Sequence, residues 1–479
     1  MSGVLLFEQI KSEKTGTYLD RDYVINVQNE IESLYIDVHV SKGVWATCMI
    51  YDPNNYLRGQ LLLTGDARSI LIHKQAHKSN PYTVPGEIYE GEWRINVSFL
   101  CNENIEAGGI WGECAVYANE LVPGTVKLDK WNWTDEKKSS FQLTLYQSEE
   151  VYQHEKRWYK GDFHTHTTFT DGEMSREENV GMAKKQQLDF FVATDHNIVP
   201  TSWHDKSDML VIPGTEVTSP LGHFNIINPN TSPFAKCKVS DMYEEKGTNK
   251  IINQNYGDAL VSINHPFLKG CPWIYEETVI EHIDTLEIIN DPTYPDNRVA
   301  TEKALIAWNV LLNDGHQITG IGGSDSHLRP TDTYEGSTEP SLMGDPGTYV
   351  YCAQLSAKQL MDSVRKGNVI VSRGGFIHFT DGHCLPGEES VLFNGILSVE
   401  VETEDAIYIE WIVDGEIKKR AYTNVHTYPF HFSETEYHWI RVDIRNTDGT
   451  LYGFSNPIYF GKKEPKIHKW KEVLEKMPK

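Results

Sequence analysis

Apolar and polar residues alternate along short segments in the first third of the chain. The segments are rich in aromatic and β-branched residues, as in SLYIDVHV (33–40), VWATCMIYD (44–52) and EWRINVSFL (92–100). Alternation with a period of two places the apolar side chains on one face of a strand. Several such strands joined by turns are typical of an antiparallel sandwich. The pattern predicts an N-terminal β-sandwich over 1–155, with a further strand at 141–147.

The pattern changes near residue 156, where short continuous apolar runs begin to alternate with segments of helical period. The runs include LDFFVATDH (188–196) and ALVSINHP (259–266). The segment TEKALIAWNVLLNDG (301–315) places its apolar residues on one helical face and stops at a glycine. Alternation of strands and helices predicts a mostly parallel sheet or barrel. We therefore expect an α/β domain over 156–385.

Period-two alternation returns in the last part of the chain. ILSVEVE (396–402), AIYIEWIVDGEI (406–417) and HWIRVDIRNTDG (438–449) alternate apolar and polar residues, and VDGE and NTDG are turn sequences typical of hairpins. The pattern predicts a C-terminal β-sandwich of immunoglobulin-like size over 386–462. The lysine-rich tail, 463–479, is expected to form a short helix on the surface.

Composition places the protein among globular chains and excludes some partners. Of 479 residues, 39% are hydrophobic and 11% aromatic, which is enough for two or three cores. The net charge of −24 argues against binding to a nucleic-acid polymer or an anionic membrane, because both need a basic surface. Seven scattered cysteines without a CxxC motif, and an N-terminus without signal-peptide features, predict a cytoplasmic protein with reduced thiols.

The strongest chemical signal begins at HTHTTFTDG (164–172). His164 and His166 are two residues apart, so on a strand both imidazoles face the same side and can bind one metal ion. Asp171 follows in the loop. With 19 histidines in the chain, a single HxH pair is weak evidence, and two solvated histidines would explain it equally well.

Further metal-ligand residues follow apolar runs, where a parallel sheet collects its functional groups. They are His196, Glu216, His223, His265, Asp325 and His327. With the first motif this makes six imidazoles and three carboxylates, too many donors for one ion and suited to two or three. Nitrogen and oxygen donors without thiolate favour Zn²⁺, Mn²⁺ or Fe²⁺. We therefore predict two to three divalent ions.

Formal charge indicates what such a centre would bind. Three divalent ions, three carboxylates and one hydroxide leave about +2 at the pocket, which favours a small anionic, phosphate-like substrate. The ions would acidify a bridging water, and the resulting hydroxide would attack phosphorus or carbon. The chain has no GxSxG motif, and this chemistry requires no serine or cysteine nucleophile.

The motifs HTHTTFTDG, ATDH, GTEV, NHP and GSDSH resemble, in order, those of the polymerase-and-histidinol-phosphatase (PHP) family of metal-dependent phosphoesterases. WNVLLNDGHQITGIGGSDSH and the flanking β modules are similar to its carbaryl-hydrolase-type branch (CehA/McbA). The resemblance covers about 156–380. It implies a distorted (βα)7 barrel, so the expected fold is an α/β barrel flanked by two β-sandwich modules.

The resemblance also implies a ligand assignment. The first ion would be held by His164, His166, Glu216 and Asp325. Glu216 would bridge to a second ion, which His265 and His223 would also hold. Asp171, His196 and His327 would hold a third, with Asp171 standing where some relatives have histidine. Glu216 and Asp325 are therefore assigned to catalysis as well as to metal binding.

Other polar residues near the motifs have weaker assignments. Arg373 is a candidate for contact with a substrate phosphate, and His204 for proton donation to a leaving group. A surface arginine explains Arg373 equally well, and an exposed histidine is the commoner explanation for His204. Asp195 is interpreted as a hydrogen-bond acceptor behind the ligands rather than a ligand. The remaining residues are Asn264, expected to orient its loop, Lys269 and Arg329, expected at the rim, and Cys237 and Cys271, expected to be ordinary core or loop thiols.

Three functions remain open from the sequence. The first is a metal-dependent phosphoesterase acting on a small phosphoester. The second is a carboxylic or carbamate ester hydrolase that uses the same ions, as the carbaryl-hydrolase-type branch implies. The third is a binding protein in which the metal site only stabilises the fold. The presence of all nine candidate ligand residues favours an enzyme over the third function, the binding protein.

Overall fold

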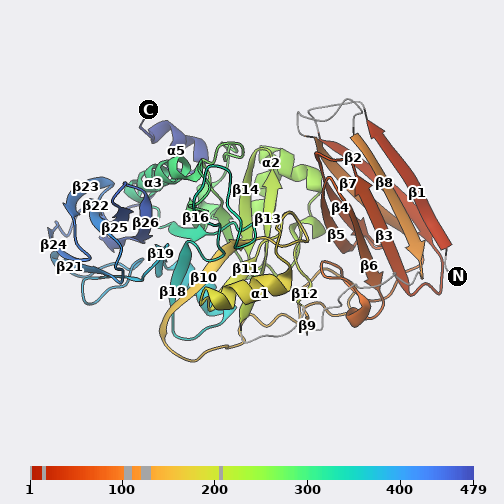
Figure 1. Cartoon of the computed structure of the whole chain (residues 1–479), viewed down its shortest axis with the longest axis horizontal. Helices are drawn as coiled ribbons and strands as arrows, with labels where there is room; N and C mark the ends of the chain where they lie inside the picture. Colours follow the sequence, from red (N-terminus) through yellow and green to blue (C-terminus); the bar gives the residue numbers. More distant parts are fainter. Residues whose placement is uncertain (1–2, 13–17, 102–109, 120–130, 204–208, 479) are drawn as a thin grey trace.

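The computed structural model describes residues 3–12, 18–101, 110–119, 131–203 and 209–478. Three regions follow one another along the long axis of the molecule, with the N-terminal strands at one end and the C-terminal strands at the other (Figure 1). Buried hydrophobic residues form three clusters, one centred on each region, and the central cluster also takes in residues of the other two. Mixed α/β architecture dominated by sheets is therefore confirmed.

Two antiparallel four-stranded sheets form the N-terminal region. Leu34, Ile36 and Val38 alternate inward and share one core with residues of the opposite sheet such as Ile95. One sheet has the order β1 (Gly3–Ser12), β8 (Ile110–Ala118), β3 (Ser33–Val40), β6 (Ala67–His73). The other has the order β2 (Leu19–Val27), β7 (Gly91–Cys101), β4 (Val44–Tyr51), β5 (Leu57–Thr64).

The prediction of a strand at 141–147 is wrong. This segment is irregular, although Phe141 and Leu143 are buried in the central core. The Leu143 amide donates to the carbonyl of Asn230 in a single contact rather than in a ladder. The alternating pattern therefore reflects burial on one side of a loop. Just before it, β9 (Trp131–Asn132) pairs with β12 (Ser202–Trp203).

Seven successive strands form the sheet of the central region. They are β10 (Arg157–Thr165), β11 (Phe190–Ala193), β13 (Leu210–Ser219), β14 (Gly222–Ile227), β15 (Leu260–Ile263), β16 (Thr285–Asn290) and β17 (Thr319–Gly323). Pairing is parallel except at β14, which is antiparallel to both neighbours. The helices of this region are α1 (Arg176–Lys185), α2 (Glu245–Ile252), α3 (Asn297–Asp314) and α4 (Ala357–Arg365), with short 3-10 turns at Pro233–Ala235, Val239–Tyr243 and Ile280–His282; a further 3-10 turn, Ala76–Lys78, lies in the N-terminal region.

The sheet curls so that its two ends meet, but no ladder closes it among the described residues. Strand β17 reaches β10 through one bridge between Thr165 and Ser326 and through the Asp325 amide, which donates to the His164 carbonyl at 2.9 Å. The described residues between β11 and β13 contain no α-helix, nor do those between β15 and β16. The complete (βα)7 barrel therefore stays a prediction.

The central sheet continues into the C-terminal region across the boundary predicted at residue 385. Beyond β10 the order is β18 (Gly347–Cys352), β19 (Val369–Ser372), β26 (Leu451–Ser455), β25 (His438–Asn446), β22 (Ile407–Val413), β23 (Glu416–Ala421), with β27 (Ile458–Phe460) beside β25. A second sheet contains β20 (Ile377–Thr380), β21 (Asn394–Val401) and β24 (Val425–His431). Both sheets contribute to one core.

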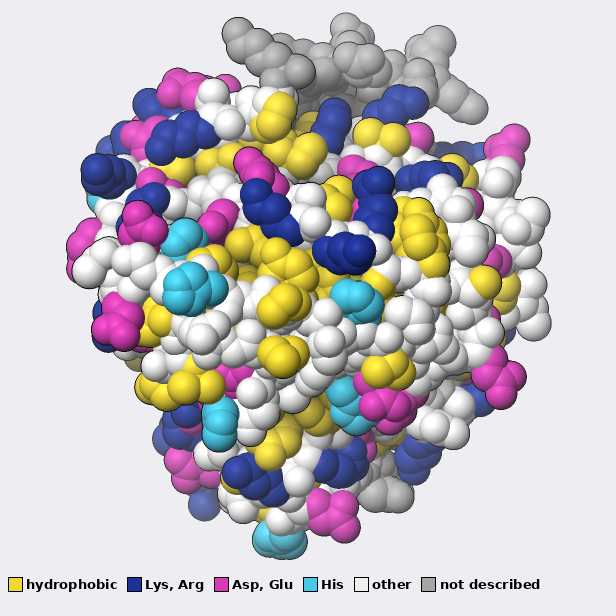
Figure 2. Space-filling model, turned by 90° about the vertical axis from the view of Figure 1, so that its left-hand side faces the viewer, with side chains coloured by type: hydrophobic (Ala, Val, Ile, Leu, Met, Phe, Trp, Pro, Cys, Tyr) yellow, Lys and Arg dark blue, Asp and Glu magenta, His cyan; other side chains and the backbone are white. Residues whose placement is uncertain are grey.

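The outer face at the C-terminal end carries hydrophobic, acidic and basic side chains side by side (Figure 2). Val391, Ile396, Tyr422 and Val425 are among the exposed hydrophobic residues of this region. Among the described helices, none combines the length and the apolar character that crossing a bilayer requires.

The C-terminal tail forms the expected helix, α5 (Trp470–Lys476), which packs beside α3 (Figure 1). Trp470 is fully buried in the central core, and its backbone amide donates to the Thr278 carbonyl at 3.0 Å. The tail is therefore part of the central fold.

We expect Trp470→Ala to destabilise the protein by about 3–5 kcal/mol, because truncating a buried tryptophan leaves a cavity. Chemical denaturation of the variant measures this loss. Glu475→Ala, at an exposed position of the same helix, is the control and should change the free energy of unfolding by less than about 0.5 kcal/mol. Equal stability of the two variants would contradict the docking of α5.

Candidate metal centre

The nine candidate ligands converge at one end of the central sheet. His164 lies near the end of β10 and Glu216 lies within β13, while His265 and Asp325 directly follow β15 and β17. Because neighbouring strands end at the same edge of a sheet, residues far apart in the sequence meet there. The structure brings all nine together into overlapping groups whose ligand atoms lie within 4.8 Å of one another or contact the shared Glu216.

The first group consists of His164, His166, Glu216 and Asp325, the same four residues that the resemblance implies for the first ion. Nε2 of His164 lies 3.3 Å from Oε1 of Glu216 and 3.2 Å from Oδ1 of Asp325. Nε2 of His166 lies 2.9 Å from the same Asp325 oxygen. His164, His166 and Glu216 are fully buried, so their polar atoms face each other rather than solvent.

The second group surrounds Asp171 in the loop after β10. Oδ1 of Asp171 lies 3.2 Å from Nε2 of His196 and 3.3 Å from Nε2 of His327. His166 belongs to this group as well, and its ring stacks against those of His196 and His327 at centroid distances of 4.3 and 4.2 Å. The three residues predicted for the third ion therefore lie together, with His166 between this group and the first.

The remaining pair, His223 and His265, lies on the other side of Glu216. Oε1 of Glu216 is 3.2 Å from Nδ1 of His223 and 3.3 Å from Nε2 of His265. The side-chain amide of Asn264 donates to the same oxygen at 3.0 Å. Glu216 therefore faces imidazoles on both sides, as a bridging ligand would.

The donors fit divalent metal ions. Several buried ligand atoms have no hydrogen-bond partner among the described residues: Nε2 of His164, both ring nitrogens of His166, Oδ1 of Asp171, Oε2 of Glu216 and Oδ1 of Asp325. Buried polar atoms without partners are costly and rare. Imidazole nitrogens and carboxylate oxygens gathered in this way suit Zn²⁺, Mn²⁺ or Fe²⁺.

Two of the buried groups, Glu216 and His166, have the charge states that bind metal. Burial raises the pKa of Glu216, but the His164, His223 and His196 imidazoles outweigh it and hold this pKa well below its ordinary value. Burial, together with His327 and His196, lowers the pKa of His166 to about 4. The carboxylate is therefore ionised and the His166 imidazole neutral at pH 7, which are the forms that bind metal. At His164, His196 and His327, burial lowers the pKa, but neighbouring carboxylates outweigh it and raise this pKa above its ordinary value, so these imidazoles would release protons on binding an ion.

Two candidate ligands have left-handed backbone conformations, which residues other than glycine rarely adopt. The φ angle is 26° at His265 and 48° at Asp325. Such conformations cost about 1–3 kcal/mol and persist where the surroundings hold them. The His265 amide donates to Oε2 of Glu287 at 2.9 Å, and the Asp325 amide donates to the His164 carbonyl. These contacts hold both turns toward the centre.

The sequence analysis missed Glu287, on β16. Its Oε1 lies 3.0 Å from Nδ1 of His164, and it is almost completely buried. A carboxylate on the far nitrogen of a metal-binding histidine orients the ring and fixes its tautomer. The sequence does carry a signal for this residue, because Glu287 is an acidic residue inside the apolar run TLEIIND.

Cys271 is also closer to the centre than predicted. Its Sγ lies 3.8 Å from Nδ1 of His265, and it forms a candidate group with His223 and His265. The expectation of an ordinary loop thiol is therefore wrong for Cys271. Because Nε2 of His265 faces Glu216, we interpret the thiol as a contact that orients this ring. Cys237 is buried in the central core, as expected.

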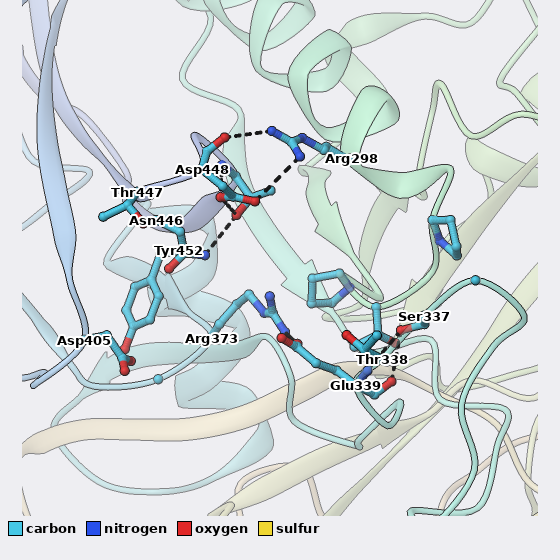
Figure 3. Close-up of a pocket in the computed structure, with 16 residues that line it drawn as sticks. Arg298, Ser337, Thr338, Glu339, Arg373, Asp405, Asn446, Thr447, Asp448 and Tyr452 are labelled. Carbon is cyan, nitrogen blue, oxygen red and sulfur yellow. Dashed lines mark hydrogen bonds and ion pairs between the residues drawn. The ribbon is translucent and has the colours of Figure 1, made fainter.

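Arg373 lies away from the candidate ligands. Its guanidinium is paired with Asp345 at 2.9 Å and Glu339 at 2.8 Å. It lines a pocket of about 810 Å³ between the central loops and the C-terminal region, shown in Figure 3 with Arg298 beside Asp448. None of the nine candidate ligands is among the residues described as lining it. Contact between Arg373 and a substrate phosphate stays a prediction.

The other assigned residues have separate outcomes. His204 lies outside the described residues. Lys269 and Arg329 are exposed and pair with Asp296 and Glu178, as expected for residues at the rim. Asp195 accepts hydrogen bonds from the loop that carries Asp171, which is the acceptor role predicted for it.

No family model and no curated protein sequence matches the chain. Among solved structures, it is similar to a two-domain protein containing a PHP-like metal-dependent phosphoesterase domain, so assigned by prediction, from Bacteroides vulgatus ATCC 8482 (16% identity, 65% of this chain, 99% of that chain, TM-score 0.35). A protein assigned as a metal-dependent phosphoesterase from Bifidobacterium adolescentis ATCC 15703 also matches (13% identity, 40% of this chain, 95% of that chain, TM-score 0.24).

A third solved structure, TmCBM61 in complex with β-1,4-galactotriose, matches at 14% identity over 25% of this chain and 88% of that chain, with a TM-score of 0.15. At these identities and TM-scores, the likenesses carry no argument about function. The function of this chain therefore rests on the geometry of its own site.

We expect Glu287→Gln to weaken metal binding about 10- to 100-fold, because the amide cannot replace the carboxylate that orients His164. Competition titration with a chelator measures the affinity. Glu276→Gln, at an exposed glutamate, is the matched control and should bind metal as the wild type does. Unchanged affinity in Glu287→Gln would contradict the orienting role.

Cys271→Ser should keep the full number of bound ions per chain, because Nε2 rather than Nδ1 of His265 faces the bridging carboxylate. Elemental analysis of the purified variant measures metal content. Loss of one ion per chain would instead identify Cys271 as a ligand.

Proposed function

We propose that the chain is a metal-dependent phosphoesterase that hydrolyses small phosphoesters. The observation that carries this proposal is the group of nine imidazole and carboxylate residues around the buried Glu216, several of whose ligand atoms face one another without a hydrogen-bond partner among the described residues. A set of this size and composition suits two to three divalent ions of Zn, Mn or Fe. When bound, such ions acidify water to form a nucleophile and polarise the bond to be cleaved.

Glu216 has the central role among the protein groups. One of its oxygens faces His164, His223 and His265, and the other lies 2.8 Å from Nδ1 of His196 and 3.5 Å from Nε2 of His166. Each oxygen can therefore serve a different side of the centre. Asp325 similarly lies between His164, His166 and His327.

With three ions bound, the charge of the centre favours an anionic substrate. Three ions outweigh the ligand carboxylates, and counting the buried Glu287 as well still leaves a formal charge of about +1 when one hydroxide is included. A positive pocket in a protein of net charge −24 attracts a small phosphoester more strongly than a neutral ester. The same ions would also activate a carboxylic or carbamate ester, which is the alternative implied by the carbaryl-hydrolase-type branch.

The test compares three p-nitrophenyl substrates, the phosphate, the phosphodiester and the acetate, with added Mn²⁺ or Zn²⁺. We expect the wild type to cleave a phosphoester and Asp325→Ala to lose at least about 100-fold in kcat, because Asp325 lies between two histidine groups of the centre. Asp332→Ala, at an exposed aspartate seven residues away, is the matched control and should keep full activity.

Each other outcome points to a different function. Cleavage of the acetate alone, abolished by Asp325→Ala, would replace the phosphoesterase by a carboxyl-ester hydrolase. Bound metal without turnover of any ester would favour a metal-stabilised binding protein. Less than about one ion per chain would contradict a metal-dependent function altogether.

A further inference from the structure

The N-terminal sandwich reaches the metal centre through Tyr82. This tyrosine lies in the loop before β7, and its hydroxyl donates a hydrogen bond to Oδ2 of Asp195. Asp195 in turn accepts hydrogen bonds from the Thr167 amide and the Thr170 hydroxyl, both at 2.8 Å. One carboxylate therefore connects the sandwich to the loop after β10.

That loop carries two of the candidate ligands, His166 at its start and Asp171 near its middle. Arg68, on β6 of the sandwich, holds the same loop by donating to the carbonyls of Thr168 and Thr170. In addition, the Trp45 ring of β4 lies 5.3 Å from the His196 ring. Residues of the sandwich thus contact both the loop that carries Asp171 and the ring of His196.

Tyr82 itself is held in an unusual position. It is 1% exposed and has a left-handed backbone conformation with φ of 65°. Its carbonyl accepts a hydrogen bond from the Gln60 amide at 3.1 Å, and its ring packs against Phe169 at a centroid distance of 4.9 Å. Burial and the Asp195 carboxylate raise the pKa of Tyr82 well above its ordinary value, so the hydroxyl stays protonated. A strained, buried donor of this kind points to a role at the site it serves.

We propose that Tyr82 is a positioning residue for the ion held by Asp171, His196 and His327, and that the N-terminal sandwich is in this way part of the metal centre. The proposal rests on the metal centre of the proposed function. Tyr82 acts through Asp195. Its hydroxyl fixes this carboxylate, and the carboxylate fixes the loop that presents Asp171. Groups behind the ligands of this kind change metal affinity without touching the ion.

The experiment measures metal content and stepwise metal affinity of the full chain for the wild type and for Tyr82→Phe. This substitution keeps the ring against Phe169 and removes only the hydroxyl. Asp171→Asn identifies which bound ion belongs to Asp171. Tyr56→Phe, at an exposed tyrosine of the same sandwich, is the matched control. Thermal unfolding of the metal-free proteins monitors the fold.

We expect Tyr82→Phe to weaken binding of the Asp171-dependent ion about 10- to 100-fold, to leave the other ions unchanged and to regain the missing ion at high Mn²⁺ concentration. Wild-type affinity in Tyr82→Phe would overturn the proposal. Parallel weakening of all ions together with a lower Tm would also overturn it, because the hydroxyl would then act on the fold as a whole, and so would an Asp171→Asn variant that loses no ion.

The outcomes separate this proposal from the proposed function. A wild type that binds metal but cleaves no phosphoester would overturn the phosphoesterase alone, because the comparison of Tyr82→Phe with Tyr56→Phe still decides the role of Tyr82. A wild type that holds no divalent ion would overturn both.

Discussion

The burial of Glu216 is the constraint on which the centre of this protein depends. Its carboxylate is completely buried and lies within 3.5 Å of ring nitrogens from five histidines. An ionised carboxylate removed from water costs several kcal/mol unless opposite charge and hydrogen bonds compensate it. The imidazoles supply part of that compensation and the ions they are suited to bind would supply more, so the strand ends must converge on this residue.

A second layer of polar groups holds the ligands in place. Glu287 contacts His164, the Thr218 hydroxyl lies 2.6 Å from Nδ1 of His196, and Asn264 donates to Glu216. The turns at His265 and Asp325 are conformationally unfavourable on their own and are held by hydrogen bonds from neighbouring strands. The geometry of the centre is therefore a property of the whole sheet edge rather than of the individual motifs.

The N-terminal sandwich and the central region share an extensive polar interface. The Gln60 side chain donates to the Val199 carbonyl at 3.0 Å, and the Tyr51 hydroxyl donates to the Phe234 carbonyl at 3.0 Å. Met49, Leu57 and Val84 of the sandwich belong to the central hydrophobic cluster. Because the interface is both packed and hydrogen bonded, changes in the sandwich can reach the ligands through few intermediates.

Local pattern alone determined the classes of element and the candidate ligands, because strand periodicity and the residues at strand ends are short-range properties. It failed at 141–147, where one-sided burial of a loop imitates a strand. Tertiary structure alone decided which groups meet: Glu287 lies 123 positions from His164, and Tyr82 lies 113 positions from Asp195. A residue such as Glu287 can stand out in the sequence, but the group that it contacts has no local signature, since these contacts arise only when the sheet curls and the sandwich packs against its edge.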